Sequence, residues 1–142
     1  MLDTDMIIFM LRGLKASARQ RARRERALAL VARCREAQAK GDVVGLSAIT
    51  VSELEFGAHN SGDYEAEIVA VHEILTPFEV YDYDGAGCPA HYGRIRRDLE
   101  QAGQVIGAMD LLIAAHALAL TATLVTNNLG NVTGRASLYL AN

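Results

Sequence analysis

Short apolar segments alternate with longer helix-forming segments along the 142-residue sequence, and this alternation constrains its fold more than any other feature. The apolar segments, which we expect to be strands, are Met1–Leu2, Val43–Ser47, Phe78–Tyr81, Ala122–Thr126 and Leu138–Leu140. Between them we expect a short helix ending at Gly13, followed by helices at 16–39, 50–57, 64–75, 86–101 and 109–120. Strands that alternate with helices predict a parallel α/β sheet. The chain length is typical of a single domain, spanning residues 1–142.

The stretch VIGAMDLLIAAHALAL, residues 105–120, contains one charged side chain, Asp110, in an otherwise apolar helix. An unpartnered carboxylate in apolar surroundings is unfavourable, so this residue needs an explanation. One interpretation is a helix N-cap, in which the carboxylate accepts hydrogen bonds from free backbone N–H groups. The other is a metal ligand that acts together with further carboxylates. The stretch alone does not decide between them.

Three other oxygen-bearing side chains occupy equivalent places. Asp3 follows the first expected strand, Glu53 lies in the helix after the second, and Asn128 follows the strand that ends at Thr126. Asp110 begins the helix that leads into that strand. Ligands of parallel sheets bind outside the carboxyl ends of the strands, so all four side chains are expected at one edge. An all-oxygen donor set favours Mg²⁺ or Mn²⁺ over zinc, and the four histidines fit no zinc-binding spacing.

Each candidate also has a purely structural interpretation. Asp3 fits a turn or cap, Asn128 fits a turn, and Thr50-Val51-Ser52-Glu53 fits the capping box at the start of a helix. From spacing alone the capping box is the favoured interpretation of Glu53. Asp84 is expected to cap the helix after it. His116 lies about 120° around the helix from Asp110, which indicates a histidine at the edge of the core.

Charge is distributed unevenly along the chain. Residues 12–40 carry a net charge of +8 and the remainder carries −11, which gives the overall −3. The arginine run RQRARRER, residues 19–26, is either a solvated helix face or a surface that contacts the phosphates of nucleic acid. No apolar run reaches the length of a membrane span, and Cys34 and Cys88 lack the spacing of a metal or redox pair. We therefore expect a cytoplasmic protein without membrane contact.

Taken together, three segments resemble the PIN domain, and specifically the VapC-type toxins of bacterial toxin–antitoxin pairs. They are LDTD at residues 2–5, SAITVSELEFGA at residues 47–58, and IRRDLEQAGQVIGAMDLLIAAHALALTATLVTNN at residues 95–128. The resemblance implies a three-layer α/β/α fold with a central, mostly parallel sheet of four to five strands. The family's acidic site falls on Asp3, Glu53, Asp110 and Asn128, with Thr126 matching a hydroxyl residue beside it. For Glu53 this reverses the interpretation favoured by spacing.

The same resemblance implies a function and partners. The expected activity is that of a ribonuclease that uses Mg²⁺ or Mn²⁺ to hydrolyse RNA phosphodiester bonds, with tRNA-like RNA as the expected substrate class. The expected partners are a cognate VapB-type antitoxin and a second copy of the chain in a homodimer. The arginine-rich helix becomes a candidate contact for RNA or antitoxin.

Departures from the family pattern leave alternatives open. Asp5 stands where the family usually has Asn, Ala108 replaces a common Pro, and Val132 replaces a customary Phe ahead of a C-terminus without the usual aromatic ending. These changes keep open a catalytically degenerate fold that serves as a binding module. The D-x-D pattern of Asp3-Thr4-Asp5 also resembles haloacid-dehalogenase-type phosphatases. Those enzymes need a lysine late in the chain, and this sequence has none after Lys40.

Overall fold

The computed structural model describes residues 1–126, and its centre is a small parallel sheet. Strand β1 (Gly45–Ser47) pairs in parallel with β2 (Glu79–Tyr81), with Leu46 opposite Val80. On the other side of β1, Leu2 forms parallel bridges to both Leu46 and Val125. The order across the sheet is therefore the Val125 segment, the Leu2 segment, β1 and β2. Four parallel segments lie side by side, which confirms the mostly parallel sheet expected from the sequence.

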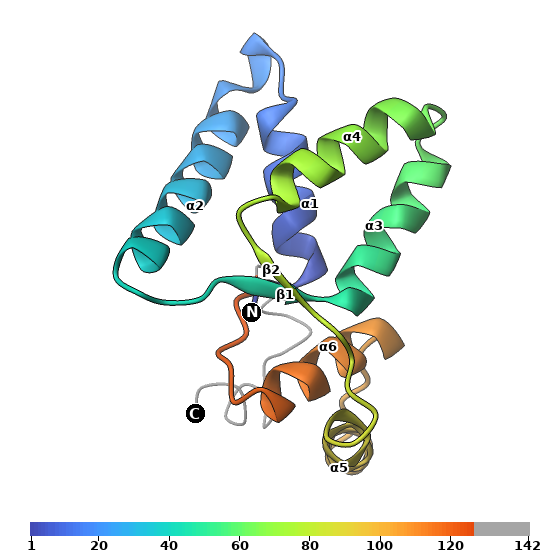
Figure 1. Ribbon diagram of the computed structural model, residues 1–142. Helices are drawn as coiled ribbons and strands as arrows, with labels where there is room; N and C mark the ends of the chain where they lie inside the picture. Colours follow the sequence, from blue (N-terminus) through green and yellow to red (C-terminus); the bar gives the residue numbers. More distant parts are fainter. Residues whose placement is uncertain (127–142) are drawn as a thin grey trace.

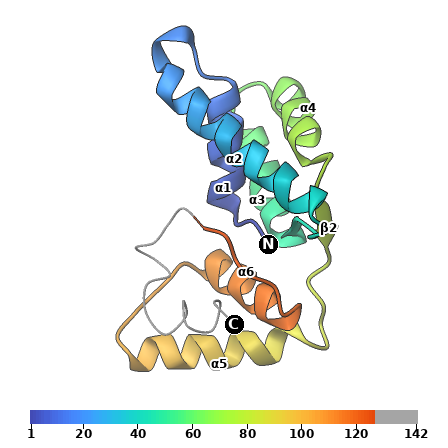
Figure 2. The same cartoon turned by 90° about the vertical axis from the view of Figure 1, so that its left-hand side faces the viewer.

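Helices cover both faces of this sheet. Figures 1 and 2 show four helices on one face: α1 (Thr4–Leu14), α2 (Arg21–Ala39), α3 (Ala48–Asn60) and α4 (Tyr64–Leu75). A 3₁₀ turn, η1 (Ala18–Gln20), precedes α2. The other face is covered by α5 (Cys88–Gln101) and α6 (Ala108–Ala119), which pack against each other. This arrangement confirms the three-layer α/β/α architecture.

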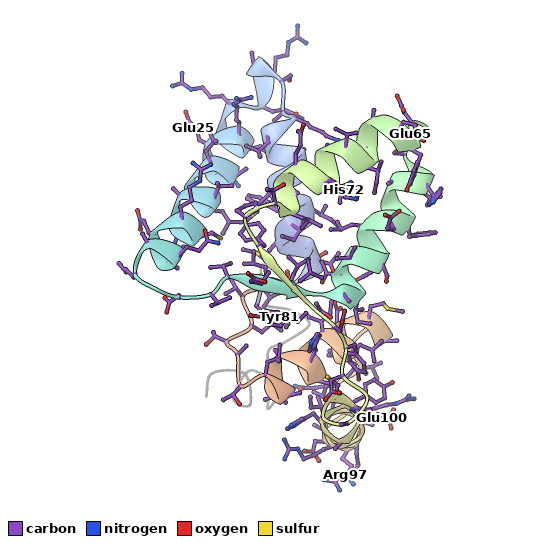
Figure 3. The ribbon with its side chains drawn as sticks, viewed as in Figure 1. Glu25, Glu65, His72, Tyr81, Arg97 and Glu100 are labelled. Carbon is purple, nitrogen blue, oxygen red and sulfur yellow. The ribbon has the colours of Figure 1, made fainter. Side chains whose placement is uncertain are left out.

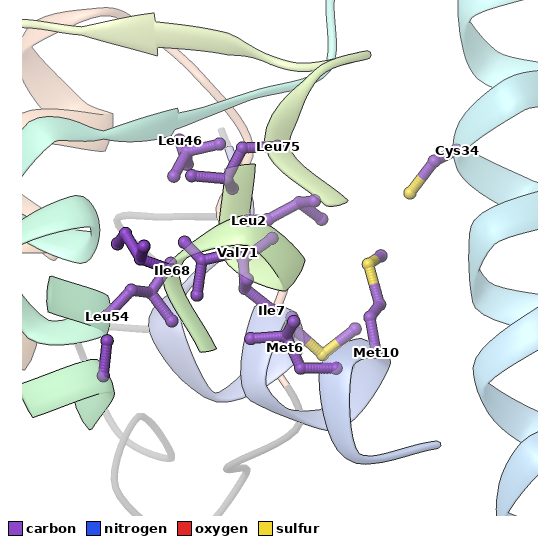
Figure 4. Packing of buried hydrophobic residues seen from close by; sticks show 12 residues of the cluster. Leu2, Met6, Ile7, Met10, Cys34, Leu46, Leu54, Ile68, Val71 and Leu75 are labelled. Carbon is purple, nitrogen blue, oxygen red and sulfur yellow. The ribbon is translucent and has the colours of Figure 1, made fainter. Parts of the chain in front are cut away.

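The larger core lies between the sheet and the four-helix layer. Ile7 and Met10 of α1 are fully buried there, together with Leu46 of β1 and Val71 of α4. Figure 4 shows these side chains converging between the helices, with Met10 near Cys34 of α2. Each fully buried aliphatic side chain of this kind contributes roughly 1.5–3 kcal/mol to folding. A second core joins α5 and α6 through Ile95, Leu99 and Leu111, among others.

Helix α2 packs against α1 through a close approach at Gly13. A Cβ atom placed on Gly13 would lie 2.2 Å from the Cβ of Ala27, which is itself fully buried. Only glycine therefore fits this contact, because overlap of that size requires the helices to separate. Most other side chains of α2 are exposed, including Glu25, which points outward in Figure 3. Few side chains of α2 therefore pack against the rest of the protein; its buried residues are Ala27 and Cys34.

The predicted element types agree with the structure, while several boundaries differ. Helix α4 begins and ends where expected, and α2 begins at Arg21, later than the expected residue 16, because the 3₁₀ turn η1 precedes it. The remaining helices differ from the expected ends by at most three residues. The first and last expected strands within residues 1–126 are shorter than typical strands and contribute only the bridging residues Leu2 and Val125. The first is short because α1 begins at Thr4, directly after it. The strand expected at Leu138–Leu140 lies outside the described residues.

Candidate acidic site at the carboxyl edge of the sheet

Asp3 lies between the first sheet segment and α1, and it caps that helix. Its carboxylate accepts a hydrogen bond of 2.9 Å from the backbone N–H of Met6. The cap suggested by the sequence is therefore correct, but the residue is also only 7% exposed. Burial raises the pKa of Asp3, while hydrogen bonds from the Thr126 side chain and the Met6 N–H oppose the rise, and the charge of Asp5 adds to it. Thr126, a predicted site residue, thus lies beside Asp3.

Glu53 projects from α3 toward the start of α1. The capping box proposed for Thr50–Glu53 is wrong, because α3 begins at Ala48 and its N-cap is Ser47, whose hydroxyl accepts the Ile49 N–H. Glu53 is instead held from another element: its Oε1 lies 2.5 Å from the Oγ1 of Thr4. Thr4 Oγ1 also lies 3.1 Å from Thr50 Oγ1. Since a hydroxyl has one hydrogen to donate, Thr4 donates to the carboxylate and accepts from Thr50.

Asp110 is the third residue of α6 and does not cap it. The N-cap is Gly107, and no side chain makes a capping hydrogen bond there. The N-cap interpretation of Asp110 is therefore wrong, although a carboxylate in the first turn still interacts favourably with the helix dipole. Burial raises the pKa of Asp110, and the charges of Asp5, Glu53 and Asp3 raise it further. Carboxylates that precede or belong to α1 and α3 therefore act electrostatically on the Asp110 carboxylate of α6.

The acidic site is defined here as Asp3, Glu53 and Asp110, with Asp5 beside them. Of the described lysines and arginines, none forms a salt bridge to Asp3, Glu53 or Asp110. Within residues 1–126, no three His, Cys, Asp or Glu side chains are close enough to hold a metal ion by themselves. Asn128, the fourth predicted ligand, lies outside the described residues. The described site is an electronegative edge and not a closed metal cage.

Buried polar side chains gather around this edge. In the described part of the chain they are Asp3, Thr4, Ser47, Thr50 and His116. Thr4, which supports Glu53, was not among the predicted site residues, although its place between Asp3 and Asp5 was a signal. Ser47 and His116 were also not predicted: Nδ1 of His116 lies 2.7 Å from the Ser47 hydroxyl. His116 is fully buried and not at the edge of the core.

The other candidate residues lie away from the acidic site. Asp84 accepts hydrogen bonds from the N–H groups of Ala86 and Gly87, in the turn ahead of α5. The N-cap of α5 is Gly87 and no side chain makes a capping hydrogen bond there, so the predicted capping role of Asp84 is wrong. Helix α2, which carries the arginine run, leads into the amino end of β1, whereas α3 follows its carboxyl end. The two helices lie on opposite sides of α1 in Figure 1. Cys34 and Cys88 are buried free thiols. No helix within residues 1–126 is both long and apolar enough to span a membrane.

Comparison with known proteins identifies related sequences. The family model of the PIN domain matches residues 1–130. The ribonuclease VapC2 of Rickettsia felis is 39% identical over 107 residues, which cover 75% of this chain and 79% of that protein. The tRNA(fMet)-specific endonuclease VapC of Shigella flexneri is 32% identical over 128 residues, covering 90% of this chain and 85% of its relative.

Solved structures show the same fold. The structure of VapBC2 from Rickettsia felis bound to a DNA fragment from their promoter matches with a TM-score of 0.77 at 30% identity, covering 91% of this chain and 87% of that one. The DNA-bound VapBC of Salmonella typhimurium matches with a TM-score of 0.74 at 30% identity, and the match covers 94% of this chain and 89% of that one. These matches extend over both helical layers and the sheet between them.

Proposed function

The chain belongs to the PIN domain family, and on this premise we propose that it is a metal-dependent endoribonuclease, the toxin component of a toxin–antitoxin pair. The observation that carries the proposal is the placement of Asp3, Glu53 and Asp110 at one edge of the sheet. Burial raises the pKa of Asp3 and of Asp110, and the charges of Asp5, Glu53 and Asp3 raise that of Asp110 further. The relatives named as ribonucleases cover most of the chain. RNA is accordingly the proposed substrate, with tRNA as the proposed class.

The donor set fits Mg²⁺ or Mn²⁺. Carboxylates without a basic partner gain most from a cation, and the hydroxyl groups of Thr4 and Thr126 orient Glu53 and Asp3. Mg²⁺ in phosphate chemistry usually takes one or two carboxylates and completes its coordination with water and substrate phosphate. An open edge is consistent with that mode. We propose Asp3, Glu53 and Asp110 as the ligands in the described part, and Asn128 as a fourth.

Hydrolysis needs a water molecule to attack phosphorus in line with the departing 3′ oxygen. Bound Mg²⁺ or Mn²⁺ would supply a lowered water pKa and neutralise the charge that develops on the phosphate. The residues of the chain hold the carboxylates in position for this reaction. The Met6 N–H and Thr126 fix the orientation of Asp3, and Thr4 fixes Glu53 from the neighbouring helix. No side-chain nucleophile is required, and the buried polar residues keep the carboxylates in place.

We propose an antitoxin protein as the main regulatory partner. A cavity of about 150 Å³ opens between α1, α3 and α4, and its lining includes Glu53 together with Ile8, Leu54 and Val71. Its lining also includes the charged residues Arg12 and Glu67, so a single side chain of a bound peptide, with both apolar and polar contacts, would fit beside Glu53. A homodimer is proposed as well: Phe56 of α3, on the same helix as Glu53, is 68% exposed. Two free thiols and an RNA substrate support a cytoplasmic location.

Cleavage of RNA by the purified protein tests this function. Structured RNA, including total tRNA, is incubated with the protein in Mn²⁺ and separately in EDTA. The same assay is run with Asp110→Asn and with a matched control, Asp42→Asn, which changes an exposed acid in the loop before β1. We expect cleavage by the wild type and by Asp42→Asn in Mn²⁺ only, and none by Asp110→Asn.

Other outcomes contradict the proposal in distinct ways. RNA binding without cleavage by the wild type would indicate the catalytically degenerate binding module. Hydrolysis of small phosphomonoesters with RNA left intact would favour the phosphatase alternative. Cleavage that survives EDTA or the Asp110→Asn change would mean that the nuclease activity does not use the acidic site.

A further inference from the structure

A buried hydrogen bond joins the two helices that carry Glu53 and Asp110. His116 lies on α6, six residues after Asp110, and its Nδ1 is 2.7 Å from the Oγ of Ser47. Ser47 ends β1 and caps α3, six residues before Glu53. Ser47 is completely buried and His116 is 1% exposed. The pair therefore connects the β1–α3 junction to α6, about 9 Å along each helix from the carboxylates.

The hydrogen atoms of this pair can be assigned. The Ser47 hydroxyl accepts the N–H of Ile49 at 3.1 Å, so its own hydrogen needs an acceptor in a site without water access. Nδ1 of His116 is the acceptor within reach among the described residues. The imidazole is then neutral, with its hydrogen on Nε2. A proton on Nδ1 would leave the serine hydrogen without an acceptor.

The surroundings also keep this ring neutral. Burial lowers the pKa of His116, and the carbonyl of Asp82 and the charges of Asp82 and Asp84 only partly oppose this. The ring of Tyr83 packs edge-on against it at 5.7 Å between centroids. Asp82 and Asp84 are not members of the acidic site. The bond is consequently a fixed connection between the helices, separate from the ionisable groups that would hold a metal.

We propose that the His116–Ser47 hydrogen bond is a positioning device that sets the separation of Glu53 and Asp110. Carboxylates from two helices can hold one metal ion only if the helices keep the right spacing. Mutation of the residues that support metal ligands typically lowers metal affinity or activity by roughly 10–100-fold. His116 and Ser47 are positioning residues, since neither reaches the carboxylates. This inference rests on the proposed function, because the Mn²⁺ readout uses the proposed metal site and the cleavage readout uses the proposed activity.

The test uses four variants and two readouts. His116→Leu removes the acceptor, Ser47→Ala removes the donor, a double variant removes both, and His116→Asn keeps an acceptor oxygen near the Nδ1 position. Mn²⁺ affinity is measured by isothermal titration calorimetry, and RNA cleavage gives kcat and KM. We expect each single variant to bind Mn²⁺ about 10-fold more weakly and to lose kcat with little change in KM. The double variant should be no worse than either single, and His116→Asn should recover most of the loss.

A matched control separates positioning from general destabilisation. Ile113→Ala removes buried atoms from the same helix without touching the bond, and Ile113 is 1% exposed. All variants are compared at a temperature where circular dichroism shows them folded. Unchanged Mn²⁺ affinity in His116→Leu and Ser47→Ala, or an equal loss in Ile113→Ala, would overturn the inference. If the wild type binds Mn²⁺ and cleaves no RNA, the proposed function fails while the Mn²⁺ measurements still decide the positioning role.

Discussion

The acidic site and the arginine-rich helix α2 are the two most charged regions of the molecule, and they are built in opposite ways. Asp3 and Glu53 are hydrogen-bonded to other groups, and Asp110 lies among their charges. The side chains of Arg23, Arg26 and Arg33 are exposed and form no salt bridge with the described residues. One region has a defined geometry, whereas the other supplies charge over a broad surface.

This difference indicates what each region can do. Carboxylates held in fixed positions fit a site where a cation and a phosphate must take one arrangement. Mobile arginines fit long-range attraction of a polyanion, which depends on charge number and salt and little on geometry. The two regions lie at opposite ends of β1, since α2 precedes that strand and α3 follows it. An RNA that contacts both would have to extend around the molecule.

The largest effect is expected at the acidic site. Asp3→Asn and Asp110→Asn each remove a proposed ligand charge, and cleavage of RNA should fall by at least about 100-fold, the upper end of what supporting residues alone produce. RNA affinity should change little, because α2 is untouched. Initial cleavage rates and filter binding on the same RNA measure the two quantities. Equal losses in cleavage rate and RNA affinity would contradict the assignment of catalysis to the acidic site and of RNA attraction to α2.

A smaller and different effect is expected at α2. In an Asp110→Asn background, reversing Arg23, Arg26 and Arg33 to Glu should weaken RNA binding about 10-fold at low salt. The slope of log affinity against log salt should become shallower, by roughly 0.7 for each phosphate of a single-stranded RNA that an arginine no longer neutralises. Changing the same three residues to Lys is the matched control and should retain most of the affinity. An unchanged RNA affinity in the Glu variant would show that these arginines are exposed to solvent and do not contact RNA.

Acid pH should weaken metal binding at the acidic site while leaving α2 unaffected. The pKa values of Asp3 and Asp110 are raised above the ordinary 3.8, so protons compete with a cation at a higher pH than for exposed carboxyls. Mn²⁺ affinity should therefore fall as the pH is lowered from about 7.5 to about 5.5, a range in which arginine stays charged. Titration calorimetry at the two pH values checks this. A pH-independent affinity would mean that these carboxyls are not the ligands.

The smallest expected effect is on stability without metal. Because the pKa of folded Asp110 lies above the unfolded value near 3.8, its charge opposes folding once the pH exceeds both. Asp110→Asn should accordingly raise the Tm of the metal-free protein by a few degrees at neutral pH. Differential scanning calorimetry in EDTA measures this, with Asp42→Asn as the unchanged reference. A lowered Tm would show that Asp110 stabilises the fold and that the acids do not repel one another.

Much of the fold could be predicted from the sequence, because the alternation of helix and strand patterns is strong. The parallel order also predicts that Asp3, Glu53 and Asp110 lie at one edge, and the charges of Glu53 and Asp3 contribute to the raised pKa of Asp110. The boundary of α3 was mispredicted, since Ser47 caps the helix three residues before Thr50, the expected cap. Local capping patterns are short and recur by chance, so only tertiary structure decides among them.

The supporting residues could not be predicted, because their roles depend on contacts between distant parts of the chain. Thr4 meets Glu53 across 49 positions, and His116 meets Ser47 across 69. The place of Thr4 between two acids marks it as a candidate, but the sequence does not show that it contacts Glu53 of another helix. A histidine in an apolar helix indicates burial, but its partner is set by helix packing.

A crystal structure of the wild-type protein soaked in Mn²⁺ tests the central claim most directly, because manganese can be located by its anomalous scattering. We predict an anomalous peak between the carboxylates of Asp3, Glu53 and Asp110, and its loss in Asp110→Asn. A peak elsewhere, or none at this edge at saturating Mn²⁺, would contradict the assignment of these three residues as one metal-binding set.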